Sequence, residues 1–224
     1  MNKTILHTAA FAAAAALAAP AFAAELPQSA ELRYSGSYGI PAVMTFTHNG
    51  NNYKIVSNIK VPLYSIRFES GGTISGNTLR PTYYKDVRSG KTYAEARFSG
   101  GKVTYGKPGE QKTESVAGPT MDLFTLAWQL AANDAKLPAG LKINKYKKLY
   151  NVGGLSPAGS SQFSIAGGRT TVNKYRVQRG DSTVNYAFAP AFNNIPAQIS
   201  YSDDGKTYDL KLTSVKINGQ TVKP

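Results

Sequence analysis

The chain contains no cysteine, and this absence removes several classes of function at once. Without cysteine there is no disulfide, no thiolate nucleophile and no cysteine-ligated metal site, and no lipid can be attached at a processing site. Histidine is almost as scarce, because only His7 and His48 are present. His48 precedes Asn49-Gly50, a typical hairpin-turn sequence. We interpret it as a surface residue and expect neither a metal nor a cofactor.

Acidic residues are half as numerous as basic ones, with 13 Asp and Glu against 26 Lys and Arg, so the formal net charge is +13. Such an excess attracts anionic surfaces, here phospholipid headgroups, lipopolysaccharide phosphates or acidic polymers. Exposed lysine also serves solubility and protects sheet edges, so the charge alone leaves both readings open. Nucleic acid fits the charge, but the export signal described next argues against it as a partner.

Long apolar runs are confined to the N-terminus. Residues 1–3 form a short basic start, residues 5–19 are almost wholly apolar, and residues 20–23 place small side chains at the positions that a signal peptidase reads. The run is too short and too rich in alanine for a stable membrane span. We expect a signal peptide over residues 1–23, cleavage after Ala23 and a periplasmic location, with secretion beyond the periplasm left open. Residues 24–224 then form a single mainly-β domain.

Alternating apolar and polar residues indicate β-strands on both sides of the middle of the chain. The period of two is clear over residues 53–61 and 63–68, and Pro62 between them indicates an edge, a bulge or a bend. Turn sequences recur at residues 48–51, 70–72, 75–77, 88–90, 99–101 and 203–206. We expect loops at residues 107–117 and, rich in Gly and Ser, at 151–168. The pattern predicts an all-β fold, a curved antiparallel sheet or unclosed β-barrel of about ten strands.

Residues 120–133 are the one convincing helix. Thr120 can cap its start, and Asp122 suits the positive end of the helix dipole. Asp122, Thr125 and Gln129 form one narrow polar stripe, while the rest of the circumference is apolar. A helix of this kind is buried on more than one side. We expect it on the concave face of the sheet, either as a lid or plug or packed between the sheet and a long loop.

Catalytic patterns are absent or explained by turns and strands. Ser57 and Lys60 fit Ser-x-x-Lys, but positions i and i+3 of a strand point to opposite faces. The sequence has no Gly-x-Ser-x-Gly nucleophile elbow, and its carboxylates are scattered. We therefore expect no enzyme, and a hydrolase with unrecognised carboxylates is the least favoured reading.

The order of landmarks resembles a known family of bacterial periplasmic proteins. Three passages carry the resemblance: residues 31–34 with 39–40, residues 79–81 running into 83–84, and residues 121–126 paired with 195–199. The family is a domain of unknown function, serial number three-one-zero-eight, and it implies no known reaction and no site residues. In architecture, the layout is also similar to the open β-barrels of periplasmic lipoprotein carriers, in which helices close an apolar cavity.

The nearly all-round apolar helix and the abundance of tyrosine favour a binding protein. We expect a non-enzymatic envelope protein that holds an apolar or amphiphilic ligand, such as a lipid or a lipoprotein-like acyl group, in a half-barrel. The alternative is a structural or interaction protein that docks on an anionic membrane surface, an envelope polymer or a protein partner. The candidate cavity or lid residues are Tyr64, Phe68, Phe124, Trp128 and Leu130. The candidate anionic-surface residues, interleaved with tyrosines, are Lys142, Lys145, Lys147 and Lys148.

Overall fold

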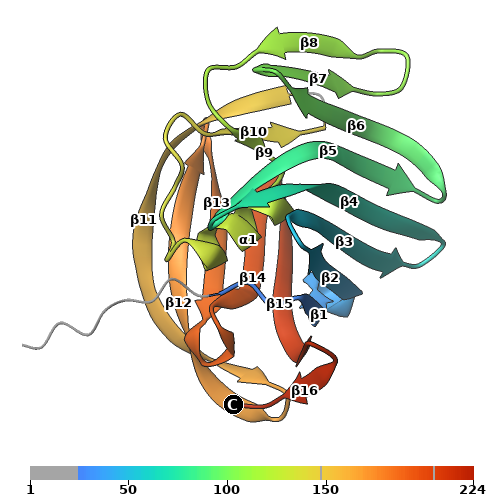
Figure 1. The fold of residues 1–224 in the computed structure, drawn as a ribbon. Helices are drawn as coiled ribbons and strands as arrows, with labels where there is room; N and C mark the ends of the chain where they lie inside the picture. The colour runs from blue at the N-terminus through green and yellow to red at the C-terminus, as the bar shows by residue number, and fades with distance from the viewer. Residues whose placement is uncertain (1–24, 147, 204) are drawn as a thin grey trace, which may run out of the picture.

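Most of the chain forms antiparallel strands that join into one large curved sheet (Figure 1). The structure, a computed structural model, describes residues 25–146, 148–203 and 205–224. The expected signal peptide over residues 1–23 lies outside the described residues, as does Lys147. The described residues contain sixteen strands, one α-helix and two short 3₁₀ turns.

The first half of the chain is a run of hairpins. Its elements are β1 (Ser29–Gly36), η1 (Ser37–Gly39), β2 (Pro41–Asn49), β3 (Asn52–Val61), β4 (Tyr64–Ser75), β5 (Thr78–Arg88), β6 (Lys91–Ser99), β7 (Lys102–Gly106) and β8 (Lys112–Ser115). The second half follows a short strand and the helix. Its elements are β9 (Thr120–Met121), α1 (Leu123–Ala132), β10 (Lys142–Lys145), β11 (Lys148–Ile165), β12 (Gly168–Arg179), β13 (Ser182–Ala189), η2 (Pro190–Phe192), β14 (Ile195–Asp203), β15 (Lys206–Ile217) and β16 (Gln220–Val222).

One long-range pairing joins the two halves into a single sheet. The order is β8-β7-β6-β5-β4-β3-β2-β1-β15-β14-β13-β12-β11-β10-β9, with β16 beside β15. The junction is the antiparallel pair β1–β15, in which Ala30 lies opposite Ile217. All neighbours are antiparallel except β9 and β10, which run parallel. The sheet curls far enough for β9 to contact β5, but the path does not close. This confirms the predicted curved antiparallel sheet of an unclosed barrel.

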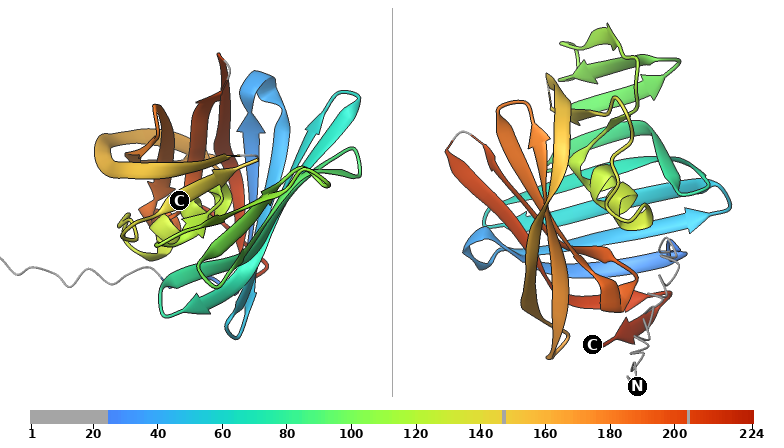
Figure 2. Two further views of the ribbon diagram at one scale, coloured as in Figure 1. Left: turned by 90° about the horizontal axis from the view of Figure 1, so that it is seen from above. Right: turned by 90° about the vertical axis from the view of Figure 1, so that its left-hand side faces the viewer.

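The helix α1 lies inside the curve, between the two halves of the sheet (Figure 2). It contacts β4 and β5 on one side and β10 and β14 on the other, and all ten of its residues are buried. The expectation of a helix on the concave face is therefore confirmed. A helix surrounded in this way needs apolar side chains around most of its circumference, which is what its sequence supplies.

The polar stripe of α1 ties the helix to the β4–β5 hairpin. The Thr125 hydroxyl lies 3.0 Å from the Ser70 hydroxyl on β4. The Gln129 carbonyl accepts the backbone N–H of Leu79 at 2.7 Å, and its amide donates to the carbonyl of Asn77 at 2.9 Å. Because buried polar groups must find partners, these bonds fix both the depth and the rotation of the helix.

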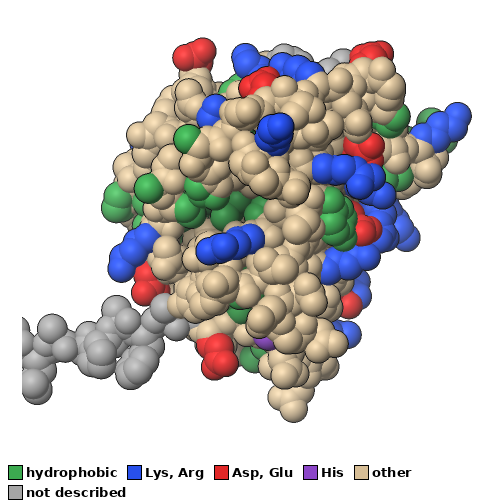
Figure 3. Space-filling model, turned by 45° about the horizontal axis from the view of Figure 1, so that its top comes forward, with side chains coloured by type: hydrophobic (Ala, Val, Ile, Leu, Met, Phe, Trp, Pro, Cys, Tyr) green, Lys and Arg blue, Asp and Glu red, His purple; other side chains and the backbone are tan. Residues whose placement is uncertain are grey.

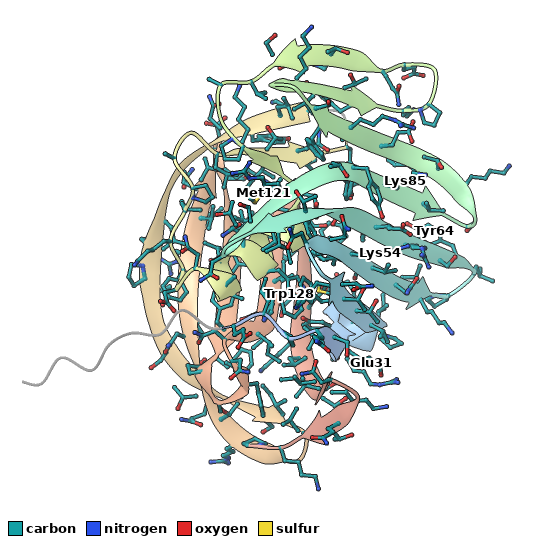
Figure 4. The ribbon with its side chains drawn as sticks, viewed as in Figure 1. Glu31, Lys54, Tyr64, Lys85, Met121 and Trp128 are labelled. Atoms are coloured by element: carbon teal, nitrogen blue, oxygen red, sulfur yellow. The ribbon has the colours of Figure 1, made fainter. Side chains whose placement is uncertain are left out.

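Trp128 anchors the other side of α1 in the core. Its ring stacks on Phe46 with the centroids 4.3 Å apart, and its indole N–H points at the sulfur of Met44 at 3.4 Å. Trp128 is fully buried. Figure 4 shows it inside the molecule, beside β2. The packing of this ring joins the helix to the N-terminal strands.

The helix begins later than the sequence predicted, and Thr120 is not its cap. Residues 120 and 121 instead form β9, and Asp122 is the N-cap, accepting the backbone N–H groups of Phe124 and Thr125 at 2.9 and 3.0 Å. Asp is at least as good a cap as Thr. The parallel pairing of Thr120 with Lys142, distant in sequence, decides the helix start.

The turn predicted at residues 70–72 is wrong, because these residues lie in the middle of β4. The register shifts between Gly71 and Gly72, so the glycines form a bulge. A Cβ at Gly72 would lie 2.0 Å from the carbonyl oxygen of Arg80, which explains the need for glycine. In a strand, glycine marks a bulge or a close approach, and the sequence alone does not separate that role from a turn. Pro62 does mark a bend, with Leu63 at φ 67° in the two-residue turn between Val61 and Tyr64.

Two predicted loops contain strands. Residues 112–115 form β8, and residues 151–168 fall mostly within β11, which pairs with β12 along its length and is interrupted by two register shifts. Gly and Ser carry little side chain, so the alternation that identifies a strand is weak in β11. Short strands such as β8, β9 and β16 show no clear period of two. The sheet therefore has more strands than the predicted ten.

We expect Gln129→Met to lower the free energy of unfolding by about 1–3 kcal/mol, because it leaves the buried N–H of Leu79 without an acceptor at nearly constant side-chain volume. Urea denaturation measures the change. The matched control is Gln162→Met, because the amide of Gln162 bonds Thr171 at the exposed surface. The control should stay within about 0.5 kcal/mol of the wild type. Equal losses in the two variants would contradict the role given to Gln129.

Candidate ligand-binding cavity

A cavity of about 400 Å³ lies at one end of the sheet, between the start of α1 and several hairpin ends. Tyr38 lies in the turn after β1, and Val61 directly precedes the β3–β4 turn. Tyr146 directly follows β10, and Thr207 is the second residue of β15. Both halves of the sheet therefore contribute to its wall. The lining residues are Gly36, Ser37, Tyr38, Ile40, Ile59, Val61, Ile66, Phe68, Tyr84, Asp122, Leu123, Phe124, Asn144, Lys145, Tyr146, Ile199, Tyr201, Thr207, Tyr208, Asp209 and Leu210.

Most of the wall is apolar. Phe68 and Phe124 meet at its inner side, with ring centroids 5.1 Å apart, and Tyr84 stacks on Phe68 at 6.4 Å. Burial raises the pKa of the Tyr84 hydroxyl well above its usual range, so this group stays protonated. Aliphatic side chains from β3, β4, β14 and β15 complete the apolar surface. They are Ile59, Val61, Ile66, Ile199 and Leu210. Such a wall suits the hydrocarbon part of a ligand.

Polar side chains reach the wall from β10. Asn144 is 2% exposed, and neither atom of its amide has a hydrogen-bond partner. Lys145 is 7% exposed, and its ammonium lies 5.4 Å from the ring centroid of Tyr146 and 5.2 Å from that of Tyr201. Together Asn144, Lys145 and Tyr201 form the part of the wall that we call the polar end.

A second buried cation lies beside the polar end. The guanidinium of Arg179, 2% exposed, lies 5.7 Å from the ring centroid of Tyr201, so two cations share this aromatic ring. Arg179 donates from Nε and Nη2 to the Ser182 hydroxyl at 3.1 and 3.0 Å, whereas its Nη1 has no hydrogen-bond partner. Tyr208 stacks on Tyr201 at 5.2 Å and continues the aromatic wall toward the surface.

The turn that carries Tyr146 is fixed from the opposite half of the sheet. Arg88 on β5 places its guanidinium 3.6 Å from the ring centroid of Tyr93 and 5.3 Å from that of Tyr146. The same guanidinium forms an ion pair with the buried carboxylate of Asp86 at 3.0 Å. Tyr93 and Tyr146 meet edge to face at 5.9 Å. This contact links the β5–β6 hairpin to the polar end of the cavity.

The structure brings together only part of the predicted cavity residues. Phe68 and Phe124 line the cavity as expected. Trp128 and Leu130 lie in the core instead, because α1 presents only its first turn to the cavity. Tyr64 is 40% exposed on the β3–β4 hairpin and is no wall residue (Figure 4). Most of the helix therefore fills the concave side, and the cavity is the space that it leaves.

The predicted lysine surface does not form one patch. Lys145 faces the cavity and is buried, whereas its register partner Lys148 is exposed, with its ammonium 5.0 Å from the ring centroid of Tyr150. Lys142 is half-buried, and Lys147 lies outside the described residues. Within β10, Lys142 and Lys145 are three positions apart and therefore point to opposite faces of the strand.

Exposed cations gather elsewhere, together with carboxylates. Figure 3 shows many Lys and Arg side chains, with Asp and Glu among them, on the side of the molecule that carries the β3–β6 hairpins. There Lys54 and Arg67 form ion pairs with Glu69 at 3.0 and 2.7 Å. Although Glu69 is partly desolvated by burial, hydrogen bonds from Arg67, Lys54 and Tyr83 lower its pKa to about 2. This face is a mixed surface rather than a purely cationic one.

Asn144, Tyr84 and Tyr201 line the cavity wall, although none of them was predicted as a site residue. No local signal indicates Asn144, because its burial between Ile143 and Lys145 is a property of the tertiary structure. For the tyrosines no local signal exists, since the chain has fourteen of them.

Comparisons with known proteins agree with the fold. The family model described as "Protein of unknown function (DUF3108)" matches residues 32–213. The chain belongs to this family. This membership confirms the resemblance carried by the three sequence passages and, like them, assigns no reaction. No curated protein matches the chain.

A solved structure supports the barrel-like architecture of this DUF3108 chain. It is the crystal structure of a beta-barrel-like protein of a domain of unknown function, DUF1849, from Brucella abortus. The two share 11% sequence identity at a TM-score of 0.50, over 87% of this chain and 99% of the other. At that identity the likeness shows the fold alone.

Two kinds of feature are absent from the part of the chain that the structure describes. No helix among them is long and apolar enough to cross a membrane. No group of three or more His, Cys, Asp or Glu side chains among them could hold a metal ion.

We expect Asp122→Asn to change the pH dependence of stability. Full burial raises the pKa of the Asp122 carboxyl, despite hydrogen bonds from Thr125, Phe124 and Ser70. The folded state therefore holds this proton to higher pH than the unfolded state, whose aspartate pKa is about 3.9. Its contribution to stability is full below that pH and declines as pH rises.

Asn keeps the cap but does not titrate, so the variant should gain stability relative to the wild type between about pH 4 and pH 7. Urea unfolding of both proteins over this range measures the difference. A difference that changes in the opposite direction would show that the hydrogen bonds to the carboxylate outweigh its burial.

Proposed function

We propose that the protein is a non-enzymatic binding protein that holds an apolar or amphiphilic ligand in the cavity beside α1. The observation that carries the proposal is the cavity itself, about 400 Å³ in volume with a mainly apolar wall. This volume falls within the range of about 300–1,000 Å³ that is typical of ligand pockets. The core of the protein packs around α1, so the cavity is a separate space and not a defect of the core.

The distribution of exposed apolar side chains supports the proposal. Among the described residues, the large apolar side chains that are exposed are Tyr38, Leu63, Tyr64 and Tyr208. Tyr38 and Tyr208 line the cavity, and Leu63 and Tyr64 come two and three residues after the wall residue Val61 at the end of β3. We call these four residues the rim. An exposed apolar patch marks a binding or membrane-contact site, and tyrosine suits a surface that is half wet and half apolar.

The polar groups of the cavity favour binding over catalysis. Of the two wall carboxylates, Asp122 is fully engaged as the helix cap, and Asp209 accepts a hydrogen bond from Gln198 at 2.7 Å. Structural roles explain both. The proposed place of action is the periplasm, on the strength of the export signal expected over residues 1–23.

A second candidate function is docking on an anionic membrane surface, an envelope polymer or a protein partner. The formal net charge of +13 and the exposed cations of the β3–β6 hairpins favour it. Binding of this kind should be lost by about 0.5 M salt, where screening is strong, whereas burial of an apolar ligand should persist. A vesicle or polymer binding assay at low and high salt therefore separates the two functions.

We expect Val61→Phe to lower the affinity for N-phenylnaphthylamine, an uncharged fluorescent probe, by about tenfold or more, because the larger ring occupies part of the cavity. Fluorescence titration measures the affinity. The matched control is Val43→Phe, because the neighbouring Ala42 pairs with the wall residue Ile59, so that Val43 points to the other face of the sheet. The control should bind the probe as the wild type does.

Native mass spectrometry of protein purified from the envelope fraction provides an independent check. A co-purifying amphiphile that is reduced in Val61→Phe but retained in Val43→Phe supports the proposal. The absence of any co-purifying amphiphile, together with no binding of the probe, would overturn it. Trp128 fluorescence is a poor reporter here, since the indole is buried against Phe46 and does not line the cavity.

A further inference from the structure

The rim presents the most exposed large apolar side chains of the described residues. Leu63 is 106% exposed and Tyr38 is 99% exposed, whereas Tyr64 and Tyr208 are 40% and 43% exposed. Because Tyr38 and Tyr208 also line the cavity, the cavity reaches the surface at the rim. Figure 4 shows Tyr64 near the hairpin tips, away from the core. Apolar surface therefore meets solvent at the place where a ligand would enter.

Two rim residues adopt a backbone conformation that their side chains disfavour. Leu63 has φ 67° and Tyr38 has φ 60°, in the left-handed region where large side chains are uncommon. Leu63 follows Pro62 in the two-residue turn between β3 and β4, and a turn with positive φ at this position normally takes glycine or asparagine. Packing does not explain the leucine, since its side chain is fully exposed. Backbone strain of this kind is concentrated at functional sites.

The strained positions with large side chains all lie at the cavity end of the sheet. Among the described non-glycine residues with positive φ, these are Tyr38, Leu63 and Tyr146, whereas the others are Asn, Asp, Ser or Ala. Tyr146 lines the cavity together with Tyr38. At the opposite end of β11, the turn before β12 carries the small residue Ala166 at φ 52°. The large strained residues are thus associated with the cavity and not with turns in general.

Exposed lysines border the rim on the N-terminal half of the sheet. Lys60 is exposed beside the end of β3 and lies opposite Ser65 in the register. The β5–β6 turn lies next to the β3–β4 turn, because the N–H of Ser89 donates to the carbonyl of Ser65 at 2.8 Å. Lys91, which begins β6 after that turn, is also exposed. The apolar rim is therefore flanked by positive charge.

We propose that the rim is a membrane-contact surface, which inserts Leu63 and Tyr38 into the interface of an anionic lipid bilayer and places the mouth of the cavity against the lipid. This inference rests on the proposed function, since it names the surface with which the cavity exchanges its ligand. Leucine gains free energy by leaving water, and tyrosine suits the boundary between water and hydrocarbon. Lysines near the surface attract anionic headgroups.

The shape of the rim favours a bilayer over a protein partner. Leu63 and Tyr38 protrude from two separate turns, and each is almost entirely surrounded by solvent. A stable protein interface needs a complementary surface of about 1,000 Å² or more, whereas a bilayer accepts separate protruding side chains without a matching shape. This contact also differs from docking by charge alone, because its apolar part persists when salt screens the lysines.

Flotation with lipid vesicles tests the proposal. We expect the wild type to float with vesicles of phosphatidylglycerol and phosphatidylethanolamine at low salt, and less strongly but still measurably at about 0.5 M salt. Vesicles of phosphatidylcholine alone should bind more weakly at low salt, because they carry no net charge. The remaining binding at high salt reports the apolar contact of the rim.

The decisive variants are Leu63→Asn and Tyr38→Asn, because asparagine tolerates the left-handed conformation and removes the apolar side chain. Leu63→Asn should lower vesicle binding by about tenfold or more, and Tyr38→Asn should lower it in the same direction. Both variants should melt at or above the temperature of the wild type, as followed by circular dichroism. The matched control is Ala166→Asn, at a left-handed turn position on the opposite end of β11. It should bind vesicles as the wild type does.

A second pair of variants measures the charged part of the contact. Lys60→Gln should weaken binding to the anionic vesicles by about fivefold at low salt and should match the wild type at high salt. Its control is Lys216→Gln, because Lys216 is exposed at the end of β15 that lies away from the cavity. This control should stay close to the wild type at both salt concentrations.

Tryptophan fluorescence locates the inserted side chain without loss of apolar surface. In Leu63→Trp the emission should shift to shorter wavelength when anionic vesicles are added, whereas Trp128 is buried and contributes a constant signal. The control Gln162→Trp introduces tryptophan at an exposed position of β11 near its far end and should show no shift. The result does not depend on the folding of the asparagine variants.

The outcomes separate this inference from the proposed function. If the wild type does not float, or if the asparagine variants float as it does and Leu63→Trp shows no shift, the membrane contact is overturned while ligand binding in solution stands. If Leu63→Asn converts a dimer to a monomer and the wild type does not float, the rim is an interface between two copies and the proposal is overturned. If N-phenylnaphthylamine does not bind the wild type, the proposed function is overturned even where flotation depends on the rim.

Discussion

The burial of α1 in the concave side of the sheet is the constraint on which the rest of the structure depends. A strongly curved sheet that does not close leaves an apolar inner face, and that face must be covered. The helix covers it from both sides, since it contacts β4 and β5 in one half and β10 and β14 in the other. Its polar stripe, Asp122, Thr125 and Gln129, fixes its position by hydrogen bonds to the chain at its own start and to the β4–β5 hairpin. The apolar remainder of the helix then completes the core around Trp128.

The cavity is a consequence of the same arrangement. The helix is ten residues long, and only its first turn lines the cavity. The space beyond Phe124 is therefore lined by both halves of the sheet and ends at the rim. β10 is covered on both faces, so the side chains of Asn144 and Lys145 are buried and have little access to water. Fold and site are thus linked, since the strand that closes the inner side of the curve also carries the polar end.

Much of the fold could be predicted from local patterns, and the errors have identifiable physical causes. Alternation and turn sequences identified the hairpins at residues 48–51, 75–77, 88–90 and 99–101. They failed where glycine has a different role, as at the bulge of Gly71 and Gly72, and in β11, whose small residues hide the period of two. For the site, Phe68 could be predicted because large apolar residues of a curved sheet face its inside, and Phe124 because the apolar helix was expected on that concave side. Trp128 and Tyr64 could not be placed correctly, because core, wall and rim all use the same residue types.

The sequence by itself determined the class of the fold, the existence and burial of one apolar helix, the excess of positive charge and the membership of a family without an assigned function. These properties follow from composition and from periods of two and of 3.6 residues, which are local. The tertiary structure decided which apolar residues form the core and which line the cavity, and it placed Lys145 inside and Lys148 outside. The physical reason is that these assignments depend on pairings such as β1 with β15, between segments far apart in the chain. These pairings set the curvature of the sheet, and the cavity exists only because of that curvature. Which side chains line the cavity is therefore decided by the tertiary structure.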